Sequence, residues 1–466
     1  MSIRSLPPFR RIYRSEISLA IAAQLLQFGM GLFIMPMALV RLNSAELGLW
    51  YVFFAVQSMV MLLDFGFTQT FSRHFAYIFG GAQFLHREGL PPSSVMPLNP
   101  SLLAATIVGA RRLYLALAVI AALVLATAGT AYIITIAGRS GLERDQVLFG
   151  WGIFCLAACL SIYFQWQSAL LSGADRVSQT YKIGIVSRMV QLISSLAALA
   201  IAPSIVTLAA AYAASIVSSY LYSHYSTRDL IPSNAASVAK HSQQSPSDIL
   251  NILWHGSSRL GLVFIGSFLI TRSNTFSISY FLGLSVSAQY AVTMQIFNLA
   301  QALATTAFAI NYPKMSGARL AGNMVRLREL FLKSLSFSWI VYAFIATAAI
   351  AAGPYIIYHL ESKTSLPGRE VMILLASVLF LEMNHSLCAN AIVTSNRVPF
   401  VRAALISGIA IAAAAVAIGL VGGTLLGFIA AQGLIQLSYN NWKWPLMVMR
   451  DFKIRRAPTE WITRGF

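Results

Sequence analysis

The sequence predicts an all-α, polytopic integral membrane protein with about twelve transmembrane helices. Of its 466 residues, 57% are hydrophobic and only 10% are charged, whereas soluble globular proteins carry about 25% charged residues. The stretches between Arg188 and Arg228 and between Arg402 and Lys443 contain no Asp, Glu, Lys or Arg. Each has about 40 residues, which is enough for two spans of roughly 20 residues and a tight turn. The segment 113–137 is apolar on every face, which excludes the alternating pattern of a membrane β-barrel.

The spans can be placed one by one from their apolar runs and turn residues. The first run, Ile17–Val40, is too long for the apolar core of a cleaved signal peptide, so we interpret it as a permanent span. Pro203 and the pair Gly422 and Gly423 lie where turns are expected within the two uncharged stretches. The predicted spans are 16–40, 47–72, 113–137, 147–171, 178–201, 204–224, 251–280, 286–311, 334–358, 370–393, 401–420 and 423–447.

The net charge of +18 is explained by membrane topology. With twelve spans and a cytoplasmic N-terminus, most loop lysines and arginines fall on the cytoplasmic face. The opposite face holds Arg41, Arg139, Arg144, Lys363 and Arg369. This asymmetry follows the positive-inside rule and predicts that both termini are cytoplasmic. The basic composition therefore gives no reason to expect nucleic acid as a partner.

One polar stretch divides the predicted spans six and six. It reads STRDLIPSNAASVAKHSQQSPSD at 226–248 and has the composition of a cytoplasmic linker. We therefore predict four parts: an N-terminal six-helix lobe at 1–225, a linker at 226–249, a C-terminal six-helix lobe at 250–450 and a basic cytoplasmic tail at 451–466.

The two halves contain segments that match in phase with this topology. AELGLWYV at 45–52 opens the second span, and AQYAVTMQ at 288–295 opens the eighth. LLSGADRVSQTYKIGIVSR at 170–188 joins the fourth and fifth spans, and AIVTSNRVPFVRAALISG at 391–408 joins the tenth and eleventh. Internal repeats of this kind are typical of secondary transporters.

The segment SAELGLWYVFFAVQSMVMLLDFGFTQTFSR at 44–73 resembles the second-span signature of bacterial polysaccharide and O-antigen flippases. It has Gly-Leu-Trp at its start, Leu-Asp-Phe-Gly in its second half and a closing arginine. LLSGADRV at 170–177 resembles the fourth-to-fifth span junction of the same family. These flippases belong to the multidrug, oligosaccharidyl-lipid and polysaccharide exporter superfamily.

This resemblance implies two six-helix lobes around a central cavity and transport by alternating access. It implies a substrate, an undecaprenyl diphosphate-linked oligosaccharide, which is moved across the bacterial inner membrane for surface polysaccharide synthesis. The expected partners are this lipid-linked oligosaccharide and membrane lipids, and other polysaccharide assembly proteins are candidates. No cofactor and no metal site are expected.

Arg188 and Arg259 are the leading candidates for substrate binding. Arg188 lies about ten residues into the fifth predicted span and Arg259 about eight into the seventh, so each is roughly 12 to 15 Å from the cytoplasmic end. A guanidinium stays charged in a poorly hydrated site and binds phosphate through two hydrogen bonds. Two arginines at similar depth in opposite lobes therefore suit a lipid diphosphate. The alternative is that each bonds backbone carbonyls or reaches to the interface.

Arg272 is a third candidate for substrate binding. It is rotated by about 220 degrees from Arg259 on a straight helix, so the two do not share a face. Gly261 and Gly266 would allow a bend that changes this. Arg272 also lies near the outer end of its span, where its side chain can extend to the interface.

Glu382 and His385 are candidates for ion coupling, because they lie one turn apart on the tenth span. A carboxylate and an imidazole at membrane depth suit a proton relay or a cation site. The alternative is a hydrogen bond that joins two helices. A set of glutamines is open to the same two interpretations, lining a cavity or joining helices: Gln24, Gln27, Gln57, Gln165, Gln167 and Gln191.

Asp64 is also a candidate for ion coupling, but the favoured interpretation is structural. A carboxylate at the centre of a membrane helix costs about 2.5 to 3.5 kcal/mol on insertion scales, so a partner is needed. Arg73 and Arg111 lie in the same lobe, and we expect one of them to neutralise Asp64.

Three other functions agree less well with the sequence. An ATP-driven pump is excluded because it needs a GxxxxGK[ST] loop, and no Gly-Lys pair occurs. A membrane glycosyltransferase or polymerase is a minor alternative, because its catalytic residues usually lie in a large outer loop, which is missing here; the protein is expected not to be an enzyme. A multidrug exporter of the same superfamily is the closer alternative. Against it, the spans hold three arginines and only two acids, and a cavity for cationic drugs favours unpaired acids.

Overall fold

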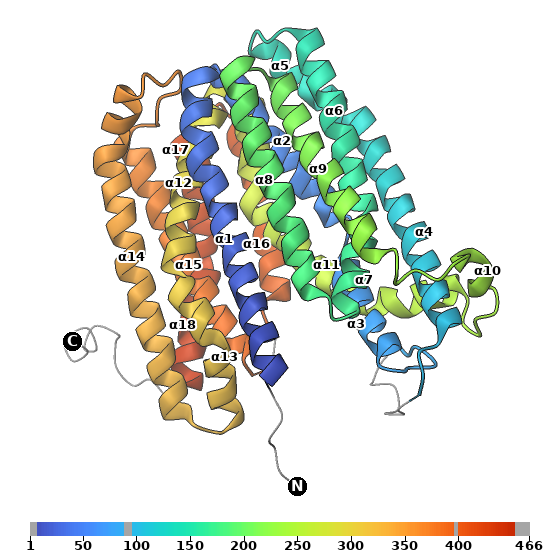
Figure 1. Ribbon diagram of the computed structural model, residues 1–466. Coiled ribbons are helices and arrows are strands. Elements are labelled where there is room, and N and C mark those ends of the chain that lie inside the picture. The colour runs from blue at the N-terminus through green and yellow to red at the C-terminus, as the bar shows by residue number, and fades with distance from the viewer. Residues whose placement is uncertain (1–6, 88–95, 396–398, 453–466) are drawn as a thin grey trace. The chain divides into compact units, whose positions relative to one another are not determined.

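The computed structural model describes residues 7–87, 96–395 and 399–452, and its described residues form helices and connecting turns without a β-strand (Figure 1). The basic tail falls outside these ranges from residue 453 onward. Contacts divide the chain into two compact units. One holds the residues up to Leu42 together with Phe53–Phe264, and the other holds Asn43–Val52 together with the residues from Ile265 onward. The predicted lobe boundaries around the linker 226–249 stay a prediction.

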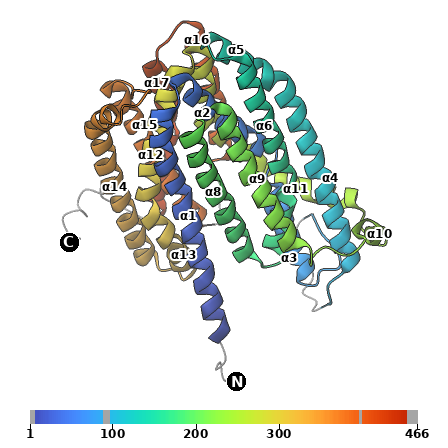
Figure 2. The same cartoon turned by 45° about the horizontal axis from the view of Figure 1, so that its top comes forward.

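The first unit is built from long helices that pack side by side. α1 packs on α8, α8 on α9, and α9 on α6 (Figure 1). The short α10 lies against α4, as the second view also shows (Figure 2). Its helices, of which α2 and α11 belong partly to the second unit, are α1 (Pro7–Arg41), α2 (Ser44–Leu62), α3 (Phe67–Phe79), α4 (Pro100–Val124), α5 (Thr130–Arg139), α6 (Arg144–Tyr163), α7 (Gln165–Gly173), α8 (Val177–Ile201), α9 (Ile205–Thr227), α10 (Ala235–Ala239) and α11 (Pro246–Phe281), with a π-helical turn at Leu125–Gly129 between α4 and α5.

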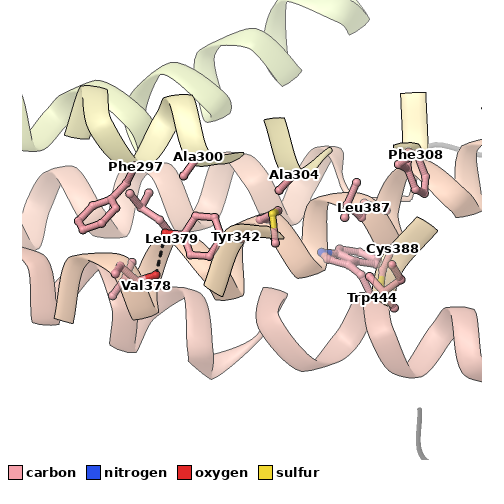
Figure 3. Close-up of a cluster of buried hydrophobic side chains, with 14 of the residues drawn as sticks. Phe297, Ala300, Ala304, Phe308, Tyr342, Val378, Leu379, Leu387, Cys388 and Trp444 are labelled. Carbon is pink, nitrogen blue, oxygen red and sulfur yellow. Dashed lines mark hydrogen bonds between the residues drawn. The ribbon is translucent and has the colours of Figure 1, made fainter. Parts of the chain in front are cut away.

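The second unit has its own hydrophobic core, formed by buried side chains from the end of α11 and from all the helices named below; Figure 3 shows part of it. Phe297 and Phe308 meet Tyr342, Leu379 and other buried apolar side chains there. The Tyr342 hydroxyl donates to the carbonyl oxygen of Ala376 at 2.9 Å, so its polar end is satisfied inside the core. The helices are α12 (Leu284–Ala304), α13 (Thr306–Leu320), α14 (Met324–His359), α15 (Arg369–Val393), α16 (Val401–Leu420), α17 (Leu425–Ser438) and α18 (Asn440–Asp451).

Local sequence signals explain where several helices begin. The Asn99 side chain caps α4 by accepting from the backbone N–H of Leu102 at 3.1 Å, and Pro100 follows it at the first helical position. Before α2, the backbone N–H of Asn43 donates to Glu46, and the N–H of Glu46 donates back to the Asn43 side chain. This reciprocal pair is a capping box, and it ends the turn that follows α1.

Within the described ranges, nine helical stretches are long and apolar enough to cross a membrane. Each coincides with one of the twelve predicted spans. The other three predicted spans fall on α11, on α12 with α13, and on α17 with α18. The last of these spans is divided: α17 has 14 residues and α18 has 12, and neither alone is as long as a span. The chain is therefore the multi-pass helical protein that the sequence predicts, with some spans divided between two helices.

The start of α2 packs with the second unit, although the rest of that helix belongs to the first. The Tyr51 hydroxyl donates to the Gln295 side chain on α12. The hydroxyl of Ser44 donates to the carbonyl oxygen of Lys363 at 2.6 Å. Gly48 lies directly against the carbonyl of Leu284, and a β-carbon at this position would overlap that oxygen. Only glycine permits this close approach of the two helices.

Candidate functional site

Glu382 lies on α15 and is held by two neutral amides from α17. Its Oε1 accepts from Gln432 Nε2 at 2.9 Å and from Gln436 Nε2 at 3.3 Å. Gln432 is only 3% exposed and Gln436 only 1%. A buried carboxylate is costly unless donors satisfy it, and these amides are such donors. The predicted candidate for ion coupling therefore lies in a polar site whose buried amides donate hydrogen bonds to it.

The polar network continues from Gln432 and Gln436 to three further helices. Asn274 Nδ2 of α11 donates to Gln432 Oε1 at 2.7 Å. Asn440 Nδ2 at the start of α18 donates to Gln436 Oε1 at 2.7 Å and to the hydroxyl of Ser407 on α16 at 2.8 Å. The oxygen Oδ1 of Asn274 is buried and has no hydrogen-bond partner among the described residues. This leaves one acceptor available beside the Glu382 cluster.

His385 lies one turn after Glu382 on α15 and contacts the same broken helix pair. Its Nδ1 lies 2.7 Å from the side-chain oxygen Oδ1 of Asn441, to which it donates. α17 and α18 are separated at Tyr439, whose φ of −143° and ψ of −60° are not helical. Interrupted helices leave backbone groups for ligands at membrane depth and recur at transporter binding sites.

The structure brings Arg272 close to this cluster. Arg272 is half-buried on the part of α11 that belongs to the second unit. The Tyr290 side chain on α12 is 2% exposed and lies near both Arg272 and Glu382. The same region of the second unit therefore holds a guanidinium and a carboxylate. We call the residues Glu382, His385, Gln432, Gln436, Asn274, Tyr290 and Arg272 the α15 cluster.

Arg188 donates a hydrogen bond to a neighbouring helix. It lies half-buried near the middle of α8, and its Nη1 donates to the carbonyl oxygen of Ala23 on α1 at 2.8 Å. This bond crosses the packed pair of α1 and α8.

The Arg259 side chain lies outside the described residues, although its backbone is part of α11. α11 is shared between the two units, and its residues up to Phe264 group with the first one. Arg259 therefore groups with Arg188, and Arg272 groups with Glu382. The expectation that Arg188 and Arg259 belong to opposite lobes stays a prediction.

Asp64 lies in the turn between α2 and α3, where hydroxyl groups bind it. Its Oδ1 accepts from the Thr68 hydroxyl and from the Tyr114 hydroxyl, each at 2.6 Å, and from the backbone N–H of Thr68 at 3.1 Å. The N-terminus of α3 adds a favourable dipole. Among the described ion pairs, none joins Asp64 to an arginine. Arg111, one of the predicted partners, lies over the Trp166 ring at 4.5 Å.

Sequence reasoning missed the amides that hold Glu382. Gln432, Gln436 and Asn440 recur every four residues in an apolar segment, so they form a polar stripe on one helical face. The spacing alone would have indicated a polar face, although the structure breaks the helix at Tyr439, before Asn440. Of the glutamines that were considered, Gln57 donates to the Ser161 hydroxyl at 3.0 Å and thereby joins α2 to α6.

No protein-family model matches this sequence, and no curated protein matches it. Solved structures do match it. The lipid II flippase MurJ, in an inward closed conformation, matches with a TM-score of 0.65 at 14% identity over 94% of this chain and 87% of that one. An inward-facing multidrug resistance MATE family transporter of the MOP superfamily gives 0.58 at 14% identity over 92% and 96%. An outward-facing structure of such a transporter gives 0.52 at 14% identity over 95% and 97%. The chain has the twelve-helix fold of MOP transporters.

Proposed function

We propose that this protein is a flippase that moves an undecaprenyl diphosphate-linked oligosaccharide across the bacterial inner membrane by alternating access. The proposal combines the flippase-like segments at 44–73 and 170–177 with the likeness in fold to a lipid II flippase. In this proposal both termini are cytoplasmic, as the positive-inside rule predicts.

The observation that carries the proposal is the charge of the spans. Away from their ends, they hold three arginines, Arg188, Arg259 and Arg272, and two acids, Asp64 and Glu382. Both acids are hydrogen-bonded by neutral groups, namely hydroxyls at Asp64 and amides at Glu382. Positive charge therefore exceeds negative charge at membrane depth, and intramembrane charges usually bind a substrate or another charge. A lipid diphosphate supplies the matching anion.

Reconstitution into liposomes tests the proposal directly. A polyprenyl diphosphate-linked oligosaccharide with a fluorescent tag on its sugar is placed in both leaflets, and an added membrane-impermeant quencher reads the outer leaflet. We expect the protein to make the inner-leaflet pool accessible, whereas a tagged phosphatidylcholine in matched vesicles stays protected. Protein-free vesicles give the background rate. Equal protection of the lipid-linked sugar with and without protein would contradict the proposal.

The multidrug exporter is tested in the same vesicles by adding a lipophilic cation such as ethidium. This alternative is supported by the likeness in fold to a MATE family transporter. Glu382 is the carboxylate that would bind a cationic drug. Ethidium transport without movement of the lipid-linked sugar would favour the exporter. The flippase predicts the opposite pattern.

A further inference from the structure

Trp254 on α11 has an exposed aromatic ring that packs against the rings of Phe65 and Phe67, which we call its backing. Its side chain is 55% exposed. The Phe65 ring lies parallel to it, with an interplanar angle of 2° and ring centroids 6.0 Å apart. The Phe67 ring lies 5.9 Å from it at 37°. Aromatic pairs at these distances attract one another, so the indole is held in one orientation.

The backing depends on an uncommon backbone conformation. Phe65 has a φ of 51°, which bulky residues rarely adopt, and Gly66 follows with a φ of 79°. The hydrogen bonds of Asp64 to Thr68 and Tyr114 hold this turn in place. Strain of this kind persists where surrounding contacts determine it, and it concentrates at functional sites.

α11 is shaped to receive the Phe65 ring. A β-carbon at Gly261 would overlap that ring, so only glycine permits it to reach the helix. The Ser257 hydroxyl, between Trp254 and Gly261, donates to the Thr70 hydroxyl of α3 at 3.0 Å. All these residues belong to the first unit. The turn after α2 therefore fixes one face of α11 and supports Trp254 from behind.

A rigid, exposed indole suits the flat face of a sugar ring. The face of the indole carries negative potential, and the ring C–H groups of a pyranose carry partial positive charge. Tryptophan also offers a large contact area with little loss of side-chain freedom. Asn251 is exposed one turn before Trp254, and its amide can both donate to and accept from sugar hydroxyls.

We propose that Trp254 is a stacking platform for a sugar ring of the lipid-linked saccharide, with Asn251 beside it for the hydroxyls. This inference rests on the proposed function and deepens it. Trp254 lies about 12 Å from the start of α11, at the end of the span that the charge distribution assigns to the cytoplasm. The glycan of a lipid-linked substrate meets the protein at this end before it is moved.

Binding to the purified protein in nanodiscs tests the platform. The two probes are farnesyl diphosphate and farnesyl diphosphate that carries one N-acetylhexosamine. We expect wild-type protein to bind the sugar-bearing probe about three- to tenfold more tightly. Trp254→Leu removes this preference and leaves the affinity for the sugar-free probe unchanged, and Trp254→Phe keeps part of it. Phe65→Leu reduces the preference because it removes the backing.

Trp442 on α18 gives a matched control. It is 45% exposed, and its Nε1 donates to the Ser438 carbonyl at 2.9 Å. Trp442→Leu should keep the full preference for the sugar-bearing probe. An unchanged preference in Trp254→Leu overturns the platform and leaves Trp254 as an anchor at the membrane interface only. If wild-type protein binds neither probe, the proposed function itself fails. The two failures are therefore distinguishable.

Discussion

The carboxylate of Glu382 on α15 accepts a hydrogen bond from the side-chain amide of Gln432 on α17 across 2.9 Å. The same amide accepts from Asn274 on α11, so Gln432 joins three helices through one side chain. Removal of this amide affects both neighbours at once, because each loses a partner inside the protein.

Gln432→Leu should therefore destabilise the protein. It leaves a buried carboxylate with one weaker donor and leaves the Asn274 amide with only its long bond to the Phe428 carbonyl oxygen, at 3.5 Å, and each loss costs about 1 to 3 kcal/mol. The measurement is thermal unfolding in detergent. Gln69→Leu, at an exposed position of α3, is the control and should change the midpoint little. The double variant Glu382→Leu with Gln432→Leu should recover part of the loss, and equal midpoints for all variants would contradict the assignment.

Glu382→Gln should slow transport and remove its dependence on an ion gradient, because the amide cannot change charge between the inward- and outward-facing states. The variant should still fold, since the amide keeps an acceptor oxygen for Gln432. Transport is measured in vesicles with imposed proton or sodium gradients. Glu370→Gln, in the exposed first turn of α15, is the control. Wild-type transport that is indifferent to both gradients would exclude coupling at Glu382, His385 and Asp64.

Arg259→Ala should abolish most surface polysaccharide in a deletion strain that carries the variant, whereas Arg259→Lys should keep part of it. Lysine keeps the charge but loses the two-pronged geometry. Loss of one charge-assisted phosphate contact, about 1.5 to 3 kcal/mol, lowers binding roughly ten- to a hundredfold. Arg188→Ala should act in the same direction. Arg402→Ala, an exposed arginine at the start of α16, is the control at matched protein levels.

The double variant of Arg188 and Arg259 to alanine gives the sharper test of the diphosphate contact. Wild-type polysaccharide from this variant would exclude both arginines as phosphate ligands. Arg272→Ala tests the third candidate separately. Loss of surface polysaccharide in this variant alone would place the anion within the α15 cluster.

The ion pair between Arg176 and Asp229 should give a small pH-dependent contribution to stability. The guanidinium donates to both oxygens of Asp229, at 2.9 and 2.5 Å, and this holds the pKa of that carboxyl below its usual value. The pair therefore stabilises the folded protein above about pH 4, the unfolded pKa of aspartate, and the stabilisation is lost as the pH falls through the folded pKa. Because both side chains are partly exposed, we expect at most about 1 kcal/mol.

The measurement is the difference in unfolding free energy between wild type and Asp229→Asn. This difference should be present at pH 7 and should shrink on acidification below pH 4. Asp145→Asn, at an exposed aspartate in the first turn of α6, is the control. A difference that is independent of pH would contradict the role of the ion pair.

The sequence predicts the helices well because lipid imposes long apolar runs that are visible in one dimension. It does not predict the interruptions. The break at Tyr439 has neither proline nor glycine at its centre, so no local signal marks it. The span predicted at 113–137 begins earlier, at Pro100, because Asn99 and Pro100 start the helix while it is still outside the apolar run.

The candidate site is predictable only along single helices. The adjacency of Glu382 and His385 follows from their spacing, but their partners Gln432 and Asn441 come from α17 and α18, which no spacing rule relates to α15. For Asp64, the need to neutralise a buried carboxylate favours an arginine as its partner. The structure instead uses the hydroxyls of Thr68 and Tyr114, because the turn at Phe65 and Gly66 directs the carboxylate toward the start of α3 and toward α4.

The contact between Gly48 and Leu284 has a consequence for how the protein is made. The first turns of α2 leave the ribosome early, but the helix against which they pack is synthesised much later in the chain. Until then this end of α2 is inserted in the bilayer without its final neighbours, and contacts of such long sequence separation form slowly. A chain that stops at the linker would thus contain inserted helices but an incomplete first half, and neither half of the coding sequence specifies a part that matures alone.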